Sequence, residues 1–323
     1  METGKPLISI LMAVYEPRLD WLREQLESLE KQSYPNLRLY VRDDCSTTVH
    51  FQDVERLVKE CIRSFPCEIR RNEKNLGSNG TFERLTREAE GEYFAYCDQD
   101  DVWLPEKLTV LQEELEQSGA LLVCSDMLII DAEGRRVADS ITKVRRRHRF
   151  RSGEGLAESL LISNFVTGCT MLVRSETAKE AVPFCPYMVH DHYLALWCGE
   201  RGAIVSIELP LLKYRVHGKN QTGVMAGVRD KVSYGQVRID AQVKRFQWLE
   251  EHFPARNGLE EGIRQRLEWM RARQRNWAGS GGRKTVWKYR VFSPLSSVFE
   301  LAAVHFPEWL FMIFIQLKRK NLV

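Results

Sequence analysis

Apolar runs alternate with amphipathic segments over the first hundred residues. Four short apolar runs, at residues 7–14, 37–41, 67–69 and 93–97, predict buried strands. Between the runs, apolar residues recur every three or four positions, as they do on one face of a helix: Leu19, Leu22, Leu26 and Leu29, then Val54, Leu57, Val58 and Cys61, then Phe82, Leu85 and Ala89. This alternation is typical of a doubly wound α/β fold, in which helices flank a mostly parallel sheet.

The pattern changes after residue 120. Separate short apolar runs predict further strands at 121–124, 127–130, 204–207 and 211–214. Beyond Gly223 the chain becomes helical and basic as far as Trp277, and a glycine-rich break follows at 279–282. We therefore expect one domain over residues 1–225 and a helical, basic and apolar C-terminal extension over residues 226–323.

Composition narrows the class of protein. The 323 residues are 44% hydrophobic and 28% charged, as in globular proteins, and the net charge of +3 is too small for a general nucleic-acid binder. The eight cysteines form no CxxC and lie mostly in apolar runs, which indicates free thiols in a reducing cytosol. The N-terminus lacks the features of a signal peptide, and no run of 18 apolar residues occurs, so we expect a cytoplasmic protein.

Three carboxylates follow the predicted strand at 93–97: Asp98, Asp100 and Asp101. Open α/β sheets bind ligands at this edge, and like charges so close together repel unless a cation joins them. Mg²⁺ takes one or two carboxylates together with substrate phosphates. A solvated acidic turn that caps the next helix is the alternative. Neither GxGxxG nor GxxxxGK[ST] is present, which disfavours dinucleotide dehydrogenases and P-loop NTPases.

Four motifs occur in order: Ile8–Glu16, Val41–Ser46, Asn75–Gly77 and Asp98–Asp101. In order and spacing they resemble an inverting family 2 glycosyltransferase of the GT-A fold, and the resemblance covers residues 5–225. It implies a nucleotide-binding half at 1–125 and an acceptor-binding half at 126–225. The later stretch Tyr214–Gly223 resembles rhamnosyltransferase-like members of the family.

The resemblance also implies the roles of individual residues. Asp191 matches the catalytic base, and His190 stands before it where many members have Glu. The expected nucleotide-binding residues are Ala13, Tyr15, Glu16, Asp44, Arg71, Asn75 and Asp98. The expected ligands of Mg²⁺ or Mn²⁺ are Asp98, Asp100 and His217. The expected acceptor-side residues are Gly168, Cys169, Thr170 and His190.

Structural alternatives stay open for several of these residues. Asp191 could be a helix N-cap, and Arg71 an exposed charge. His217 could be an ordinary loop histidine, and Gly168–Thr170 a packed turn. Asp43, beside Asp44, is the second candidate for the pyrimidine contact and could be a structural cap instead.

The activity implied by the resemblance is sugar transfer, with inversion, in bacterial cell-surface polysaccharide synthesis such as that of O-antigen or capsule. The donor would be a nucleoside-diphosphate sugar, with dTDP-L-rhamnose expected and a UDP-hexose or UDP-N-acetylhexosamine as the alternative. The acceptor would be a saccharide or a lipid-linked saccharide. A nucleotidyltransferase would need a glycine-rich basic loop where this chain has Ala13–Glu16. A degenerate binding module is disfavoured because Asp44, Asp98, Asp100 and Asp191 are all present.

The C-terminal segment suggests contact with a membrane. Trp309–Ile315 is apolar all round, but seven residues are too few to span a bilayer. Basic residues lie nearby, at Arg283, Lys284, Lys288, Arg290 and 318–320. We expect residues 283–323 to form a peripheral anchor on the inner face of the plasma membrane. A packed terminal helix and a homodimer interface are the alternatives.

Overall fold

The computed structural model describes residues 4–145, 147–218, 225 and 227–319. The chain forms two compact units, Met1–His217 and Gly218–Val323, and each is considered by itself. The predicted domain boundary at 225 falls a few residues later than this division. Residues 219–223 of the rhamnosyltransferase-like stretch, and Lys320 of the basic C-terminus, lie outside the described residues.

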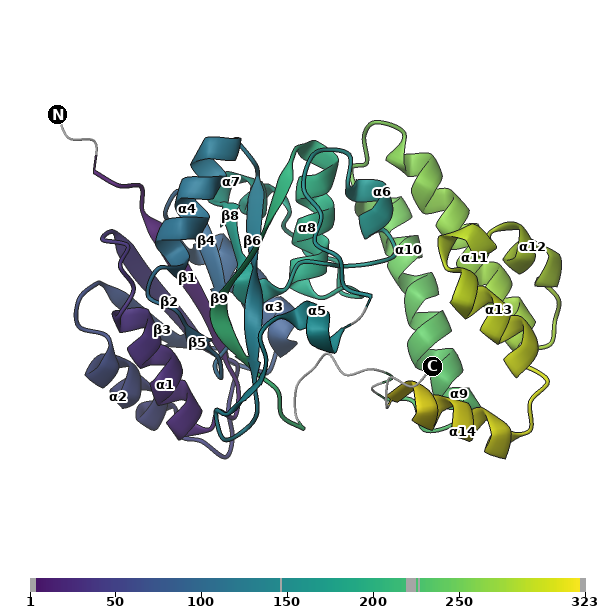
Figure 1. The fold of residues 1–323 in the computed structure, drawn as a ribbon, viewed down its shortest axis with the longest axis horizontal. Helices are drawn as coiled ribbons and strands as arrows, with labels where there is room; N and C mark the ends of the chain where they lie inside the picture. Colours follow the sequence, from purple (N-terminus) through teal and green to yellow (C-terminus); the bar gives the residue numbers. More distant parts are fainter. Residues whose placement is uncertain (1–3, 146, 219–224, 226, 320–323) are drawn as a thin grey trace. The chain divides into compact units, whose positions relative to one another are not determined.

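The first unit is built on a nine-stranded sheet (Figure 1). Its strands are β1 Ile8–Val14, β2 Leu37–Asp43, β3 Cys67–Arg71, β4 Tyr93–Cys97, β5 Val102–Trp103, β6 Leu122–Ile130, β7 Arg136–Ala138, β8 Met171–Arg174 and β9 Ile204–Arg215. They lie in the order β3-β2-β1-β4-β8-β6-β9-β5, with β7 paired to β6. The first four strands are parallel, whereas β8 is antiparallel to both β4 and β6. The predicted α/β fold is confirmed, and its second half is a mixed sheet.

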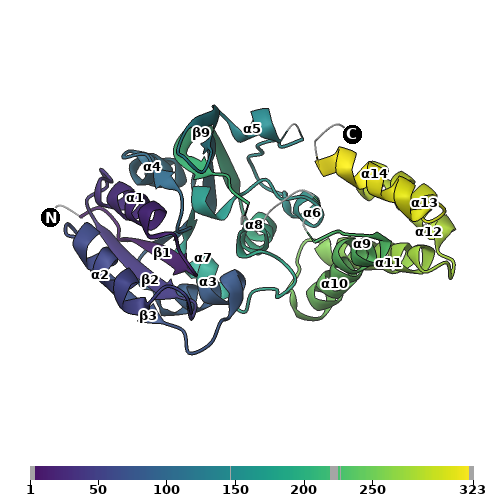
Figure 2. The same ribbon diagram turned by 90° about the horizontal axis from the view of Figure 1, so that it is seen from below.

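Eight helices accompany this sheet within the described part of the first unit: α1 Leu19–Glu30, α2 Phe51–Cys61, α3 Gly77–Glu88, α4 Lys107–Ser118, α5 Ile141–Val144, α6 Ala157–Leu160, α7 Ser175–Glu180 and α8 His190–Arg201. Figure 2 shows α1 and α2 on one face of the parallel strands and α3 on the other. The helical periodicity identified the packed faces correctly, because Val54, Leu57, Val58 and Cys61 of α2 are all buried. In α1 the first leucine, Leu19, is exposed instead.

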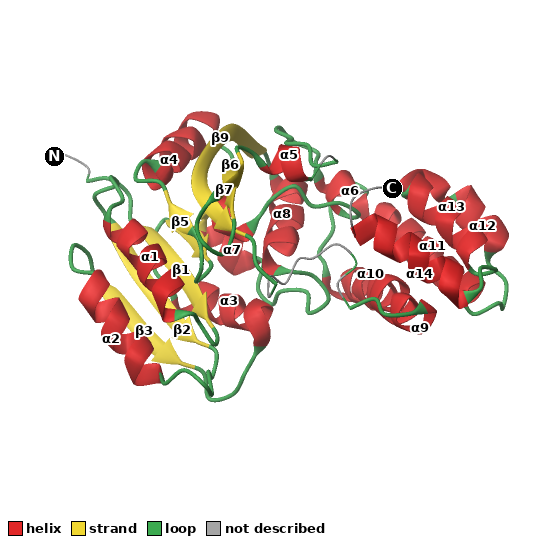
Figure 3. Ribbon diagram, turned by 60° about the horizontal axis from the view of Figure 1, so that its bottom comes forward, coloured by secondary structure: helices red, strands yellow, loops and turns green. Residues whose placement is uncertain are grey.

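The strand predictions beyond residue 120 were too short. The runs at 121–124 and 127–130 belong to the single strand β6, and those at 204–207 and 211–214 belong to β9. Ser125 and Asp126 interrupt the apolar pattern, but both are buried, and Asp126 Oδ1 accepts the N–H groups of Met127 and Ile141. Register shifts at these positions let β6 and β9 stay paired and curve together (Figure 3).

The second unit is helical: α9 Lys231–Tyr234, the π-helical turn η2 Gly235–Asp240, α10 Ala241–His252, α11 Leu259–Trp277, α12 Arg283–Lys288, η3 Arg290–Phe292, α13 Pro294–Ala303 and α14 Glu308–Arg319. Its small core includes Tyr234, Phe311 and Ile315. Glu300 is buried in this unit and accepts hydrogen bonds from Arg273 and Tyr234. In the described part of the chain, no helix is long and apolar enough to cross a membrane.

Candidate active site

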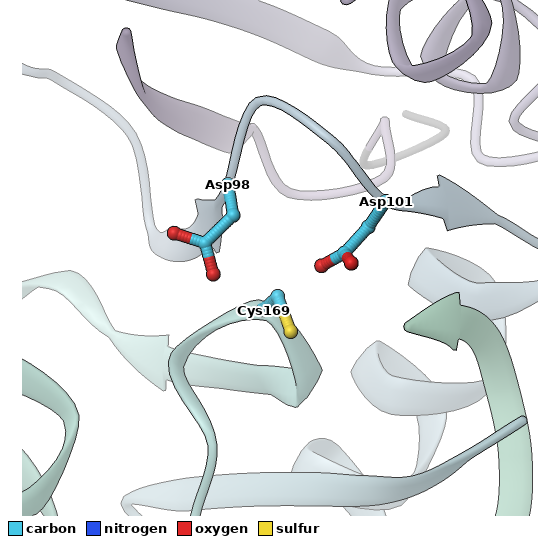
Figure 4. Close-up of side chains that lie close together, drawn as sticks. All are labelled: Asp98, Asp101 and Cys169. Atoms are coloured by element: carbon cyan, nitrogen blue, oxygen red, sulfur yellow. The ribbon is translucent and has the colours of Figure 1, made fainter. Parts of the chain in front are cut away.

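The acidic turn between β4 and β5 gathers carboxylates against a buried cysteine. Asp98 and Asp101 lie on the two sides of the turn, with Cys169 between them on the loop before β8 (Figure 4). One ligand atom from each of the three lies within 4.8 Å of the others. Asp101 Oδ1 accepts the backbone N–H of Arg215 at 3.0 Å, while its buried Oδ2 has no hydrogen-bond partner among the described residues. The turn therefore has acceptor capacity that the protein leaves unused.

Burial and mutual repulsion disfavour ionisation of this cluster. Burial, followed by the charges of Asp101 and Asp100, raises the pKa of Asp98 well above its usual value. Burial and the charge of Asp100 raise the pKa of Asp101 to about 7. A cation at the turn would relieve both effects. Burial also raises the pKa of the Cys169 thiol. Sulfur is a soft ligand, whereas Mg²⁺ prefers oxygen ligands.

Lys107, at the start of α4, lies beneath the turn and was not predicted from the sequence. Its fully buried Nζ donates a hydrogen bond to Cys169 O at 2.7 Å and lies over the ring of Trp103. Burial lowers the pKa of Lys107 to about 7. A lysine in an amphipathic helix ordinarily lies at the surface, so no sequence signal distinguished this one.

His217 lies beside the acidic turn. Its Nε2 is 2.6 Å from Asp100 Oδ2, and its ring lies 4.9 Å from that of Trp21. Carboxylate oxygens from Asp98 and Asp100 with one imidazole suit Mn²⁺, and the carboxylates alone suit Mg²⁺. The structure brings Asp100 and His217 together, whereas Asp98 lies with Asp101 and Cys169. Joint binding of a divalent cation by Asp98, Asp100 and His217 stays a prediction.

Asp191 lies in the first turn of α8, and the N-cap position belongs to Val189 instead. Its Oδ2 accepts the N–H of Gly168 at 2.9 Å, and its Oδ1 accepts Asn164 Nδ2 at 3.1 Å. Burial raises the pKa of Asp191 to about 6, although these hydrogen bonds act in the opposite direction and lower it. The carboxylate is thus oriented, ionised at neutral pH and more basic than an ordinary aspartate, which suits a general base. Asn164 was not predicted.

Two of the predicted acceptor-side residues, Gly168 and His190, lie beside this base. A Cβ added at Gly168 would lie 2.6 Å from His190 Nε2, so any side chain there would require the buried His190 ring to move. The His190 ring is buried against Phe82, at 4.1 Å between centroids, and Tyr96, at 5.2 Å. Thr170 is buried too. Their contact with an acceptor stays a prediction, and packing accounts for much of what they do.

At the other end of the edge, Asp44 is held by neighbouring loops. Its Oδ1 accepts Asn72 Nδ2 and the N–H of Leu76, both at 2.8 Å, and Asn75 Nδ2 donates to its carbonyl oxygen at 3.2 Å. Tyr15 is half exposed. Gln99, from the acidic turn, bonds both the N–H and the carbonyl of Tyr15. These hydrogen bonds link the acidic turn, the predicted metal site, directly to Tyr15, a predicted nucleotide-binding residue.

Other predicted nucleotide-binding residues make structural contacts. Glu16 accepts the N–H groups of residues 47–49, and the hydroxyl of Thr48 and the N–H of Thr47 lower its pKa to about 2. Arg71 Nε lies 3.2 Å from Asp43 Oδ2, and the Asp43 carboxylate also accepts the N–H and the hydroxyl of Ser46. Ala13 is half-buried on β1. Contact of Ala13, Glu16 and Arg71 with a nucleotide stays a prediction.

Comparisons with known proteins agree on one family. The family model described as glycosyl transferase family 2 matches residues 9–180, more than half of the chain. The dTDP-rhamnosyl transferase RfbG of Shigella flexneri is 25% identical over 71% of this chain and 78% of its own. An uncharacterized glycosyltransferase of Haemophilus influenzae is 31% identical, over 35% of each chain.

Solved structures share the fold at low sequence identity. TarS residues 1–349 of S. aureus, in complex with UDP-GlcNAc, is 14% identical with a TM-score of 0.58, covering 97% of this chain and 92% of that one. The mannosyltransferase PcManGT of Pyrobaculum calidifontis, in complex with GDP-Man and Mn²⁺, is 14% identical with a TM-score of 0.56, covering 99% and 86%. The GT-A-like fold is thereby confirmed.

Proposed function

Since the chain belongs to glycosyltransferase family 2, we propose that it moves a sugar, with inversion, from a nucleoside-diphosphate donor to a saccharide or lipid-linked saccharide. The proposed process is the assembly of a bacterial cell-surface polysaccharide, such as O-antigen or capsule. Two features of the first unit support the proposal together. Asp191 is held in a fixed orientation and has a raised pKa, and Asp98 and Asp101 lie close together at the acidic turn.

In the proposed reaction, Asp191 accepts the proton of the acceptor hydroxyl as that oxygen attacks the anomeric carbon. The hydrogen bonds from Gly168 and Asn164 fix the direction of its carboxylate, so proton transfer needs no reorientation. Asp44, at the far end of the edge, would accept the imide N–H of a pyrimidine.

Asp98, Asp100 and His217 would hold Mg²⁺ or Mn²⁺. When bound, the cation neutralises charge on the diphosphate leaving group. The complex of PcManGT with GDP-Man and Mn²⁺ supports such a site in a protein of this fold.

We propose dTDP-L-rhamnose as the donor. The support is the Tyr214–Gly223 resemblance together with the similarity to RfbG. The alternative donor is a UDP-hexose or UDP-N-acetylhexosamine, and the complex of TarS with UDP-GlcNAc supports it. The test is a donor-hydrolysis panel, combined with thermal stabilisation by dTDP, UDP and GDP with and without Mn²⁺. Faster turnover of UDP-glucose or UDP-GlcNAc than of dTDP-rhamnose would overturn the rhamnose assignment.

We also propose peripheral contact with the cytoplasmic face of the plasma membrane through residues 283–323. The predicted anchor needs one correction, because Phe311 and Ile315 are buried in the core of the second unit. The exposed apolar side chains are others: Trp287, Val291, Leu295, Val298, Trp309 and Ile313. Exposed basic residues accompany them at Arg283, Lys284, Lys288 and Arg290, a composition that suits an anionic membrane surface.

Flotation with anionic liposomes tests this contact. The variant Trp309→Ser with Ile313→Ser should float less than the unaltered protein, whereas the control Val137→Ser, an equally exposed apolar site on the first unit, should not change. Equal flotation of all three proteins would reject the anchor. A shift from dimer to monomer in the Trp309/Ile313 variant, without a change in flotation, would assign these residues to a homodimer interface.

A further inference from the structure

A short 3₁₀ turn, η1 Gly168–Thr170, contacts both chemical groups of the candidate site. At its first residue, the N–H of Gly168 donates to Asp191 Oδ2 at 2.9 Å. At its second residue, the thiol of Cys169 lies beside Asp98 and Asp101, with one ligand atom of each within 4.8 Å of the others (Figure 4). The position of the η1 turn therefore sets where the hydrogen-bond donor of the proposed base lies relative to the acidic turn.

The η1 turn is closed by its own hydrogen bonds and anchored from outside at one carbonyl. Thr167 O accepts both the N–H of Thr170, at 2.9 Å, and its hydroxyl, at 2.7 Å. The carbonyl oxygen of Cys169 instead accepts a hydrogen bond from Lys107 Nζ at 2.7 Å. This bond ties the turn to the first residue of α4, more than sixty positions earlier in the chain.

The anchoring ammonium group has a narrowly defined position. The side chain of Lys107 is fully buried, and its Nζ lies 2.9 Å from the centroid of the Trp103 ring. Burying an ammonium group is costly unless it is hydrogen-bonded, so its few partners determine where it can lie. Trp103 and Lys107 directly follow the acidic turn in sequence. The anchor thus belongs to the same segment as Asp101.

We propose that Lys107 is a positioning residue for sugar transfer: it holds the η1 turn so that the N–H of Gly168 directs Asp191 toward the acceptor hydroxyl. The inference rests on the proposed function, in which Asp191 is the base. The other oxygen of this carboxylate is held separately, by Asn164 Nδ2 at 3.1 Å. A carboxylate held at both oxygens keeps one orientation, whereas one held at a single oxygen can turn away from the reacting hydroxyl.

Donor hydrolysis by the full chain, with water in place of the acceptor, tests the proposal. The substrate is the nucleotide sugar that the donor panel shows to be turned over fastest, and the released nucleoside diphosphate is measured with Mn²⁺ present. The test variant Lys107→Met removes the hydrogen-bond donor and keeps the length of the side chain. The matched control is Leu115→Ala, a fully buried core residue about two turns further along α4, which calibrates the effect of lost stability.

We expect Lys107→Met to lower kcat about tenfold or more, the scale of a misplaced catalytic group, without changing the KM of the donor. Thermal stabilisation by nucleotide with Mn²⁺ should be the same as in the unaltered protein. Leu115→Ala should be less stable but keep its kcat at a temperature where it is folded. An equal kcat in the two variants, or a weakened donor in Lys107→Met, would contradict the positioning role.

The same substitution in an Asp191→Asn background asks whether the effect passes through the base. With no base to direct, Lys107→Met should lower the residual rate by less than about twofold. A purely structural role, or an action on the acidic turn alone, would give the same loss in both backgrounds. That result would show the inference to be wrong.

A second variant covers the case in which Lys107→Met does not fold. Thr170→Val removes the hydroxyl that closes the η1 turn and keeps the size of the side chain. It should show the same pattern: a lower kcat, an unchanged donor KM and little further effect in the Asp191→Asn background. An unchanged kcat in folded Thr170→Val would mean that the turn does not position the base.

The unaltered protein separates this inference from the proposed function. If it hydrolyses no nucleotide sugar, the proposed function fails. If it does hydrolyse one, while Lys107→Met retains the kcat of the control, only the positioning role of Lys107 fails.

Discussion

Replacing Asp191 by asparagine should inactivate the protein and stabilise it at the same time. The substitution keeps the size of the side chain, and an amide oxygen can still accept the N–H of Gly168. It removes the proton acceptor, so transfer should fall at least about a hundredfold, the usual effect of losing a general base. Donor binding should not change, because in the proposed reaction Asp191 takes a proton from the acceptor hydroxyl and makes no contact with the donor.

The gain in stability follows from the pKa. The rise in the pKa of Asp191 from 3.8 to about 6 corresponds to about 3 kcal/mol against the ionised form at neutral pH. Partial exposure of the side chain reduces this to about 1–2 kcal/mol, and loss of a negative charge in the first turn of α8 costs about 0.3–1 kcal/mol. We expect a net gain of about 1 kcal/mol, or about 2–4 °C in Tm for a unit of this size.

The pH dependence has a definite sign. Below pH 3.8 the carboxyl is protonated in both the folded and the unfolded chain, so the contribution of its raised pKa to stability is fully present. That contribution is lost as the pH rises from 3.8 through about 6, because over this range the unfolded chain has released the proton while the folded chain still holds it. The advantage of asparagine should therefore grow between pH 4 and 6 and stay constant above.

Thermal unfolding at pH 4, 5 and 7.5 measures this advantage. Asp53→Asn is the matched control, since Asp53 also lies in the first turn of a helix but pairs with Arg56 on the surface. It should show no stabilisation. A lower Tm for the Asp191 variant at pH 7.5 would show that the hydrogen bonds of the Asp191 carboxylate stabilise the protein by more than its burial destabilises it. That result would refute the raised pKa assigned to Asp191.

Three further substitutions test the rest of the site. Asp100→Ala should abolish transfer and weaken Mn²⁺-dependent nucleotide binding in a titration; near wild-type activity with binding still metal-dependent would contradict the proposed ligand. Lys107→Met should lower the free energy of unfolding by about 1–3 kcal/mol in urea, because it leaves the buried carbonyl oxygen of Cys169 without its hydrogen-bond donor, and an unchanged midpoint would reject that role. Gly168→Ala should reduce transfer more than donor binding, since its Cβ would meet His190 beside the base, and equal losses of both would argue against a positioning effect.

Hydrophobic periodicity was a sound guide where burial is one-sided and uninterrupted. The packed face of α2 and the parallel strands were predicted because their apolar residues follow one period without a break. The same periodicity was misleading at β6, where Ser125 and Asp126 are buried and paired although they are polar. Their burial depends on hydrogen bonds to distant backbone, such as the N–H of Ile141, and no local pattern reports that.

The candidate site shows the same limit in its chemistry. Glu16 and Asp191 are both acidic residues near an expected ligand, and the sequence offers no means of ranking their basicity. Five donors from residues 47–49 satisfy Glu16 and lower its pKa to about 2, whereas burial with two donors leaves Asp191 at about 6. Only the second carboxylate is basic enough to take a proton efficiently near neutral pH. The order of the motifs therefore located the edge of the sheet. The pKa of each carboxylate at that edge depends on burial and on hydrogen-bond donors from remote segments of the chain, which no local sequence pattern reports.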